Sequence, residues 1–258
     1  MPDASPIPPA RRWSSDLALA VIFMTRLPLR LSGPLAEDAH ARAMGWFPLV
    51  GAGVGLFGGT VYALASLAHI PPLPAALLAL CALVWITGGL HEDGAADVAD
   101  GFGGGRDKAR KLEIMRDSRV GSYGVLAIVF SVAIRASALS ALADPGTVLA
   151  ALAASGALSR GGMAAIARRM APARADGLAA RQGRPTAATV ALSIAIGAAV
   201  ALLALTAKAP AAILAATLAT AAVALLARRQ IGGHTGDVFG AAQQAGEAAV
   251  LLTLSALR

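Results

Sequence analysis

The stretch "TAATVALSIAIGAAVALLALTA", residues 186–207, carries no charged side chain from end to end. It is followed almost at once by a second uncharged run, "PAAILAATLATAAVALLA", residues 210–227. About 20 residues of α-helix cross the roughly 30 Å hydrocarbon core of a bilayer, so each run is about long enough to span one. Several such runs recur, and little polar material remains to coat a soluble surface. The runs therefore predict a membrane protein rather than the buried helices of a large soluble one.

The composition of the whole chain supports this prediction. Hydrophobic residues make up 57% of the 258 residues and the mean hydropathy is +0.66, whereas about 45–50% apolar residues are usual in soluble domains. The Pro-rich N-terminus does not resemble a cleaved signal peptide, and the single Cys81 excludes an intrachain disulfide. We expect one all-α domain over residues 1–258, a multi-pass integral membrane helical bundle, with a flexible N-terminal segment at 1–15.

The apolar runs predict about six or seven transmembrane helices. Six predicted spans cover residues 46–68, 73–90, 121–142, 147–167, 187–207 and 210–227. A further apolar helix, 241–257, contains Glu247 and two Gln, so it either spans the membrane or lies at the interface. The segment 16–31 is interrupted by Arg26 and Pro28, and we expect it to be an interfacial or re-entrant helix.

Basic residues are concentrated on one side of the predicted spans. The N-terminal 44 residues and the loops 91–120, 168–186 and 228–240 carry 18 Lys and Arg, whereas the three alternate connections carry only Lys208. Loops rich in Lys and Arg stay in the cytoplasm, so these segments are predicted to face it. The net charge of +7 fits contact with anionic lipid headgroups and anionic substrates. With aromatic residues at 4% and basic residues scattered over separate loops, we expect no nucleic-acid partner.

One of these loops contains nearly half of the acidic residues. The stretch "HEDGAADVADGFGGGRDKARKLEIMRDSR", residues 91–119, holds seven of the 15 Asp and Glu. Asp93, Asp97 and Asp100 stand at i, i+4 and i+7, so on a helix all three project from one face. Like charges at this spacing repel each other, and more strongly near a membrane. The arrangement therefore indicates that something positive compensates the three carboxylates.

A second acidic pair follows a glycine-rich segment. Glu113 and Asp117 are again four residues apart, and residues 101–107 between the two sets are expected to form a flexible turn rather than regular helix. Carboxylate-only ligands favour Mg²⁺, Mn²⁺ or Ca²⁺ over zinc, and the spacing of a calcium EF-hand is absent. We therefore predict a Mg²⁺ site. The alternative is a solvated charged loop in which Asp93 caps a helix. It suits Asp107 and Glu92 but explains the shared face of the three Asp poorly.

Two more polar motifs lie on the same predicted side. Ser159 and Arg160 fall near the cytoplasmic end of a membrane helix, where an Arg usually has a functional partner, and its guanidinium suits a phosphate. The alternative is that Arg160 snorkels to the interface. The segment 228–244 contains a polar turn that could offer amide donors to phosphate and one more carboxylate. Its residues of interest are Gly232, Gly233, Thr235, Gly236 and Asp237.

The remaining polar residues allow two interpretations each. His91 and His234 border these motifs and are either interfacial residues or catalytic ones. Arg135, in the middle of a predicted span, either pairs with an acidic residue of the site or stabilises the bundle. Taken together, carboxylates, a predicted Mg²⁺ and several Arg at the membrane boundary suggest transfer of a phosphorylated group. In such chemistry, the metal and the cations neutralise charge that develops on the phosphate oxygens.

Six segments resemble the cobalamin synthase family, the adenosylcobinamide-GDP ribazoletransferases of the late B12 pathway. The resemblance runs in order over about residues 20–255, nearly the whole chain. The segments are "TRLPL" (25–29), "FPLVGAGVG" (47–55), "TGGLHEDGAADVADGFGGG" (87–105), "RKLEIMRDSRVGSYG" (110–124), "ALSR" (157–160) and "GGHTGDVFGA" (232–241). The acidic motifs of the third and fourth segments are specific in combination.

The resemblance implies a Mg²⁺-dependent transferase of the bacterial cytoplasmic (inner) membrane, with its active site facing the cytoplasm. In the implied reaction, a ribose hydroxyl of α-ribazole, free or 5′-phosphorylated, attacks the phosphate attached to cobinamide in adenosylcobinamide-GDP. GMP leaves, and adenosylcobalamin or its 5′-phosphate forms. Beyond these substrates and membrane lipid, the expected partners are a second copy of the chain or other late cobalamin-pathway enzymes.

The resemblance also assigns roles to residues of this sequence. Metal ligands would be Asp93, Asp97 and Asp100. Catalytic residues would be Glu113 and Asp117, as further ligands or general base, and Arg119 and Arg160, on the diphosphate. Substrate-binding residues would be His91, Ser118, Ser159, Gly232, Gly233, Thr235 and Asp237. One departure is Glu92, at a position usually apolar in the family, which we interpret as peripheral because it lies one residue off the Asp face.

Two other functions are weighed against this one. A CDP-alcohol phosphotransferase of lipid synthesis also uses an aspartate-rich membrane site, but its D-G-x-x-A-R opening is not met at Asp97 and Val98. A cation transporter would place its acidic site near the bilayer midplane on broken helices. The acidic cluster of this chain instead belongs to a predicted cytoplasmic loop with basic residues mixed in.

Overall fold

A computed structural model describes residues 9–31, 33–177 and 182–258, and in this part of the chain the secondary structure is helical apart from one bridge between Pro172 and His234. The elements are α1 (Pro9–Met24), α2 (Ala39–Ala43), η1 (Met44–Trp46), α3 (Phe47–Leu67), α4 (Pro72–Thr87), α5 (Leu90–Gly104), α6 (Lys108–Ile114), α7 (Ser122–Leu142), α8 (Pro145–Gly161), α9 (Met163–Arg169), α11 (Ala187–Leu205), η2 (Thr206–Lys208), α12 (Ala209–Ile231) and α13 (Gly236–Ala256). The predicted flexible segment 1–15 falls partly outside the described residues, and from Pro9 onward it is helical.

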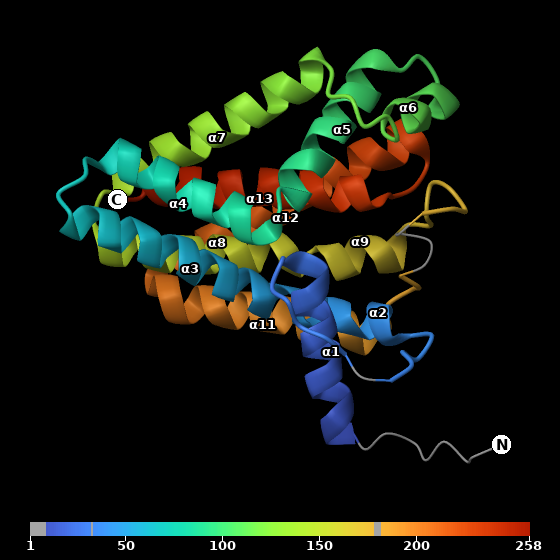
Figure 1. Ribbon diagram of the computed structural model, residues 1–258, viewed down its shortest axis with the longest axis horizontal. Coiled ribbons are helices and arrows are strands. Elements are labelled where there is room, and N and C mark those ends of the chain that lie inside the picture. The colour runs from blue at the N-terminus through green and yellow to red at the C-terminus, as the bar shows by residue number, and fades with distance from the viewer. Residues whose placement is uncertain (1–8, 32, 178–181) are drawn as a thin grey trace.

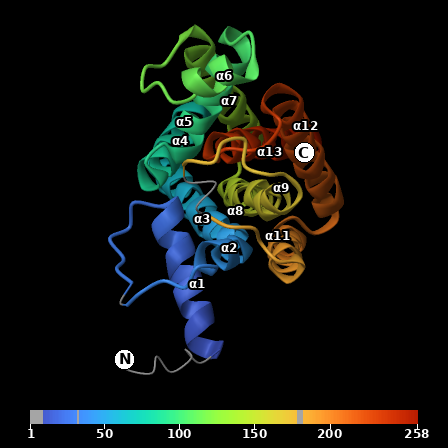
Figure 2. The same ribbon diagram turned by 90° about the vertical axis from the view of Figure 1, so that its right-hand side faces the viewer.

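The bundle is built around α8 and α13 (Figures 1 and 2). α8 packs on α3, α11 and α13, and it is buried over most of its length. Its small residues permit this. A Cβ atom on Gly51 of α3 would come 2.1 Å from the carbonyl oxygen of Gly156, so the two backbones touch. Close backbone approach through small residues is how helices associate in a membrane, where apolar surface alone gives no preference for protein over lipid.

The all-α, multi-pass architecture is confirmed, with a different span count. Among the described residues, four helical stretches are long and apolar enough to cross a membrane: Ala39–Leu67, Ser122–Leu142, Pro145–Arg169 and Ala187–Ile231. The last stretch contains both α11 and α12, which were predicted from the sequence as two separate spans. The chain reverses direction between them at Thr206, where φ is 49° (Figure 1). A fifth span exists if the bent pair α4 and α5 is counted as one. α13 is not among these stretches.

The chain bends by 90° between α4 and α5, at two glycines. Gly88 and Gly89 both adopt left-handed backbone conformations, with φ of 68° and 73°. Non-glycine residues rarely adopt this region, so the Gly-Gly pair permits a turn that other residues would oppose. The bend is not evident from hydropathy, which extends the predicted span to residue 90. It directs α5 away from α4 and across α13.

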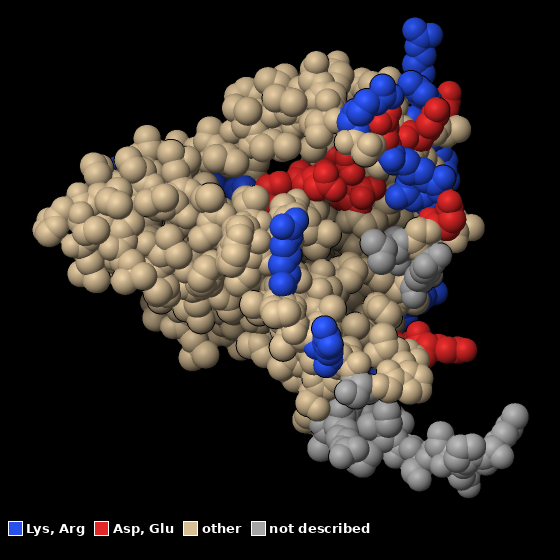
Figure 3. All heavy atoms as spheres, in the orientation of Figure 1, with Lys and Arg blue, Asp and Glu red and all other residues tan. Residues whose placement is uncertain are grey.

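Charged residues gather at one end of the bundle. Figure 3 shows Lys, Arg, Asp and Glu side chains crowded at the right-hand end, over α5 and α6, and hardly any at the left-hand end. The turns between α3 and α4, α7 and α8, and α11 and α12 lie at the left-hand end (Figure 1). The predicted division of loops into a basic and a nearly uncharged side therefore corresponds to two ends of one folded bundle.

Candidate active site

The centre of the candidate site is the crossing of α5 and α13. A Cβ atom on Gly94 would lie 2.9 Å from the carbonyl oxygen of Asp237, and one on Gly240 would lie 2.9 Å from that of His91. The two backbones therefore meet without side chains between them. This contact places Asp93 and Asp97, on α5, beside Asp237 in the first turn of α13. We call Asp93, Asp97 and Asp237 the acidic cluster.

Little positive charge compensates the acidic cluster. Asp97 interacts electrostatically with Asp93, Asp237 and Asp100, which carry the same sign of charge. Arg174 opposes this repulsion. Arg174 is the cation nearest to Asp237, at 3.7 Å from its Oδ2, beyond hydrogen-bonding range. Burial raises the pKa of the Asp237 carboxyl, an effect opposed by the hydrogen bond that Thr235 donates to it. Figure 3 shows acidic side chains gathered in a hollow beneath α7. The cluster therefore has an excess of negative charge that a cation would relieve.

Asp100 differs from the other two aspartates of α5. It is 9% exposed, and its two carboxylate oxygens accept the backbone N–H groups of Gly121 and Gly124, at 2.7 and 2.9 Å. Gly121 is the N-cap of α7 and Gly124 lies in its first turn, where free N–H groups attract a carboxylate. Asp100 thus caps α7 from another helix. Asp100 was predicted to be a metal ligand, but both of its carboxylate oxygens already accept hydrogen bonds that stabilise the fold.

The second acidic pair lines a cavity of about 310 Å³ together with Asp100. Glu113 pairs with Arg110 at 2.8 Å, and Asp117 pairs with Arg119 at 2.7 Å. The Arg119 side chain and its backbone N–H hold the pKa of the Asp117 carboxyl at about 2. Asp100 is therefore the residue through which the aspartates of α5 reach the cavity of the second acidic pair. The predicted substrate residue Ser118 is exposed beside this cavity.

The glycine-rich segment between the two sets is not the flexible turn predicted from the sequence. α5 continues as helix to Gly104, and only the following residues, up to Asp107, leave it. A Cβ atom on Gly101 would lie 2.5 Å from Met115, and one on Gly103 would lie 2.8 Å from the ring of Tyr123. These glycines admit close packing of α6 and α7 against α5. Asp107, assigned from the sequence only to a charged loop, caps α6 by accepting the N–H of Arg110. Asp93, the residue named as a cap in that alternative, lies inside α5, whose N-cap is Gly89.

The turn at 232–237 is held by its own backbone. Gly232 ends α12 in a left-handed conformation, and His234 donates its N–H to Ala171 and accepts one from Ala173. A Cβ atom on Gly233 would collide with the same segment, 2.4 Å from the carbonyl oxygen of Ala171. The Thr235 hydroxyl caps α13 by accepting the N–H of Val238. Gly232, Gly233 and Thr235, predicted to bind substrate, thus build the turn that presents Asp237.

A buried ion cluster adjoins the acidic cluster. The sequence indicated a structural or paired role for Arg135, but it did not identify the two partners. Arg135 of α7 is 1% exposed and pairs with Glu92 of α5 at 3.2 Å and with Glu247 of α13 at 2.9 Å. Gln243 donates to Glu247 and Gln244 donates to Glu92. Glu92, interpreted as peripheral from the sequence, is therefore a buried residue that joins three helices. The sequence signals were Arg135 in an apolar helix and the interruption of 241–257 by Glu247 and two Gln.

Three further predicted site residues lie beside this ion cluster. Arg160 is 2% exposed and donates to the carbonyl oxygen of Gly156, one turn back on α8. Ser159 is fully buried and accepts a hydrogen bond from Gln243, at 3.4 Å. His91 is also buried, and its Nε2 has no hydrogen-bond partner among the described residues. Arg160 and Ser159 do not line the cavity of about 310 Å³ beside Glu113, nor a second cavity of about 460 Å³ between α11 and α12. Their contact with substrate stays a prediction.

The donor set fits Mg²⁺ better than a metal that needs a complete protein cage. The described residues contain no group of three or more His, Cys, Asp or Glu already arranged to hold a metal ion. Mg²⁺ does not require one, because it is usually bound through one or two carboxylates and completes its shell with water and substrate phosphates. The acidic cluster offers only carboxylates, with unrelieved negative charge. One or two of the three carboxylates Asp93, Asp97 and Asp237 would therefore be enough to hold such an ion.

The fold and the site together define a multi-pass α-helical membrane protein with an acidic site at its charged end. Comparison with known proteins narrows this class. The profile of the cobalamin-5-phosphate synthase family matches residues 16–255, and the chain belongs to that family.

Individual relatives agree with the family. The adenosylcobinamide-GDP ribazoletransferase of Bradyrhizobium diazoefficiens is 48% identical over 249 residues, which is 96% of each chain. Proteins of the same name from Mesorhizobium japonicum and Azorhizobium caulinodans are 45% and 42% identical, and each comparison covers more than nine-tenths of both chains. No solved structure matches this chain.

Proposed function

We propose that this chain is an adenosylcobinamide-GDP ribazoletransferase of a late step in cobalamin biosynthesis. A ribose hydroxyl of α-ribazole or of its 5′-phosphate attacks the phosphorus attached to cobinamide. A new oxygen–phosphorus bond forms, the bond between the two phosphates breaks, and GMP leaves with the bonding electrons. The hydroxyl gives up its proton, and adenosylcobalamin or its 5′-phosphate is the product. Membership of the family and the names of the relatives support this reaction.

The observation that carries the proposal is the acidic cluster at the α5–α13 crossing. A diphosphate substrate is anionic and would be repelled by three carboxylates, unless a cation lies between them. When bound, Mg²⁺ would supply neutralisation of charge on the reacting diphosphate, held by Asp93, Asp97 and Asp237. Arg174, next to Asp237, already carries one positive charge at this point.

The neighbouring cavity has the groups that the rest of the reaction needs. Arg110 and Arg119 line it, and both present guanidinium groups of the kind that bind phosphate oxygens in pairs. Asp117 is ionised at physiological pH, as an ordinary Asp carboxyl is, and Arg119 lowers its pKa further, to about 2. Glu113 is exposed beside Arg110. Either carboxylate could accept the proton of the attacking hydroxyl, a role in which position matters before pKa.

The proposal includes the side of the membrane on which the reaction occurs. Because the basic loops and both parts of the site lie at one end of the bundle, the site would face the cytoplasm of a bacterial inner membrane. That side has anionic lipid and a supply of nucleotide-linked substrates. Self-association and association with other late cobalamin-pathway enzymes also stay predictions.

An assay of GMP release tests the proposal. Full-length protein in liposomes is given adenosylcobinamide-GDP, α-ribazole and Mg²⁺. Asp97→Asn is expected to lower the rate about 100-fold or more, because the variant lacks one charge of the acidic cluster. Chelation of Mg²⁺ should stop the reaction, and added Mg²⁺ should restore it.

The matched control is Asp107→Asn, which removes a charge from the same end of the bundle. Asn caps a helix about as well as Asp, so α6 keeps its first turn and GMP release should stay close to wild type. The proposal is wrong if the wild-type protein releases no GMP, or if Asp97→Asn is fully active. Release that persists without α-ribazole would indicate hydrolysis instead of transfer.

A further inference from the structure

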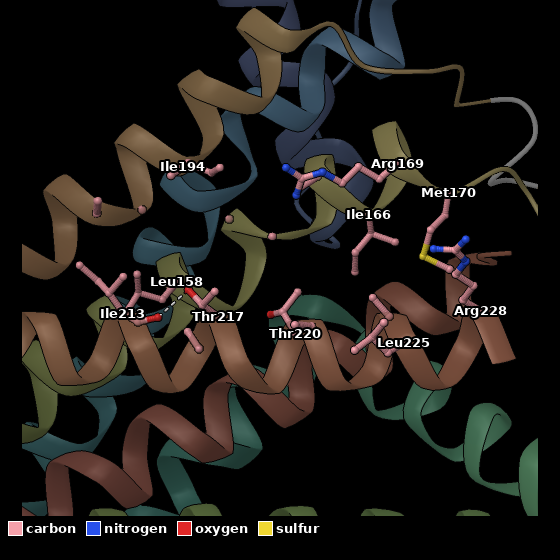
Figure 4. A pocket seen from close by; sticks show the side chains of 18 residues that line it. Leu158, Ile166, Arg169, Met170, Ile194, Ile213, Thr217, Thr220, Leu225 and Arg228 are labelled. Carbon is pink, nitrogen blue, oxygen red and sulfur yellow. Dashed lines mark hydrogen bonds between the residues drawn. The ribbon is translucent and has the colours of Figure 1, made fainter. Parts of the chain in front are cut away.

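A groove runs between α11 and α12, on the outside of the bundle away from α5. It encloses about 460 Å³ and its floor is formed by α8 and α9, through residues such as Leu158 and Ile166. Figure 4 shows Ile194 of α11 on one side and Ile213 and Leu225 of α12 on the other. α11 packs mainly on α8 while α12 packs mainly on α13. The two helices therefore diverge from their turn at Thr206, and the groove fills the space between them.

The wall of this groove is apolar along most of its length. The Thr217 hydroxyl donates to the carbonyl oxygen of Ile213 on its own helix, at 2.7 Å, so it is not free to donate to a ligand (Figure 4). The stretch 187–231 that forms both sides is the least buried of the four candidate spans, with 22% of its most apolar window buried. The groove is thus open to the surface that would face lipid, and its chemistry suits a hydrocarbon chain.

Two arginines stand at the charged end of the groove. Arg169 ends α9 and Arg228 lies in the last turns of α12, and both line the groove near Met170 (Figure 4). Both are exposed, and among the described residues neither forms an ion pair with Asp or Glu. An apolar groove with two uncompensated guanidinium groups at one end is complementary to a molecule that has a hydrocarbon chain and an anionic phosphate.

We propose that this groove binds one anionic phospholipid. An acyl chain lies between α11 and α12, and the lipid phosphate lies between Arg169 and Arg228, at the level where the charged end of the bundle meets the headgroups. Guanidinium groups match phosphate oxygens in geometry as well as in charge. The proposal concerns the lipid-facing side of the bundle and does not depend on the reaction proposed for the α5–α13 site.

The test measures lipid binding to the full-length protein by native mass spectrometry. Purified protein in detergent is titrated with phosphatidylglycerol or with phosphatidylcholine, both with palmitoyl and oleoyl chains. Wild type should bind the first phosphatidylglycerol about 10- to 30-fold more tightly than the first phosphatidylcholine. The reason is that each Arg near an anionic headgroup strengthens its binding about fivefold. The variant Arg169→Gln/Arg228→Gln should bind both lipids with equal affinity.

Three controls make the outcome specific. Arg229→Gln removes the neighbouring charge on α12, which does not line the groove, and should keep the preference within about twofold of wild type because it tests diffuse charge alone. Ala221→Trp fills the groove and should weaken the first binding event for both lipids. Inorganic phosphate should not compete. The proposal is wrong if the two lipids bind wild type equally, if the double variant keeps the preference, or if Arg229→Gln loses it as fully.

Discussion

Two groups of carboxylates lie where α5 meets α13, the ion cluster and the acidic cluster. Each includes one of two neighbouring residues of α5, Glu92 and Asp93. Glu92 turns into the bundle and meets Arg135, which also binds Glu247. Asp93 faces outward and meets Asp97 and Asp237, with Arg174 at 3.7 Å from Asp237 as the closest positive group. Glu92 is therefore a buried charge with a partner of opposite sign, whereas the next residue, Asp93, is an exposed charge surrounded by other carboxylates.

The contrast separates the carboxylates that hold the fold from those that are left for a ligand. A buried charge in a membrane bundle is tolerated when an opposite charge and hydrogen bonds satisfy it, as at Arg135. The acidic cluster lacks this compensation, so its residues should contribute little to stability and much to activity. The following variants are designed to separate these two contributions.

The largest expected effect is on the ion cluster. Arg135→Leu leaves Glu92 and Glu247 buried without their cation, and removal of one partner of a buried pair costs about 3–5 kcal/mol. The variant should unfold at clearly lower temperature in detergent than wild type. The triple variant Arg135→Met/Glu92→Gln/Glu247→Gln removes all three charges and should recover most of the loss. If the single variant is as stable as wild type, the ion cluster is not structural.

The acidic cluster should behave in the opposite way. Asp237→Asn is expected to lower GMP release about 100-fold, equivalent to about 2.7 kcal/mol of activation free energy. Its unfolding temperature should be unchanged or higher, because burial and Asp93 both disfavour the charge of Asp237 in the folded protein. The control is Asp144→Asn, a helix cap at the other end of the bundle, which should keep full activity. A large loss of stability in Asp237→Asn would contradict the comparison.

Asp100 lies between the two extremes. Asp100→Asn keeps one acceptor oxygen but turns an amide N–H group toward an N–H of α7, so one of two hydrogen bonds is lost. We expect a loss of about 1–2 kcal/mol in the free energy of unfolding, measured in detergent. GMP release per folded molecule should fall less than in Asp97→Asn. An activity loss as large as that of Asp97→Asn, without a change in stability, would restore Asp100 to the metal ligands.

The smallest expected effect on stability is at Glu113. Its pair with Arg110 is exposed, with side chains 69% and 57% accessible, and pairs of this kind contribute about 0.2–1 kcal/mol. Glu113→Gln should therefore change the free energy of unfolding by no more than about 0.5 kcal/mol. Reduced GMP release at this unchanged stability would assign Glu113 the proton-accepting role, and unchanged release would leave Asp117. A loss of stability above 1 kcal/mol would contradict its place on the surface.

Part of the site could be predicted from local sequence. Asp93 and Asp97 share a face because a helix repeats every 3.6 residues. Residues 101–104 were predicted wrongly, because glycine is a helix breaker by propensity. In the fold, Met115 and Tyr123 pack closely onto two of these glycines. Propensity describes an isolated segment, and tertiary packing outweighs it here.

The amino-acid sequence is enough to predict a helical membrane protein of the cobalamin synthase family with its charges at one end. Uncharged runs, Lys and Arg counts, and short motifs carry that information locally. The contacts between helices were visible only in the fold, where Asp237 joins Asp93 and Asp97, Asp100 caps α7, and Glu92 meets Arg135. Periodicity tells which face of a helix a residue occupies, but not which helix lies opposite. Here the crossing at Gly94 and Gly240 sets that neighbour, because these backbones can touch.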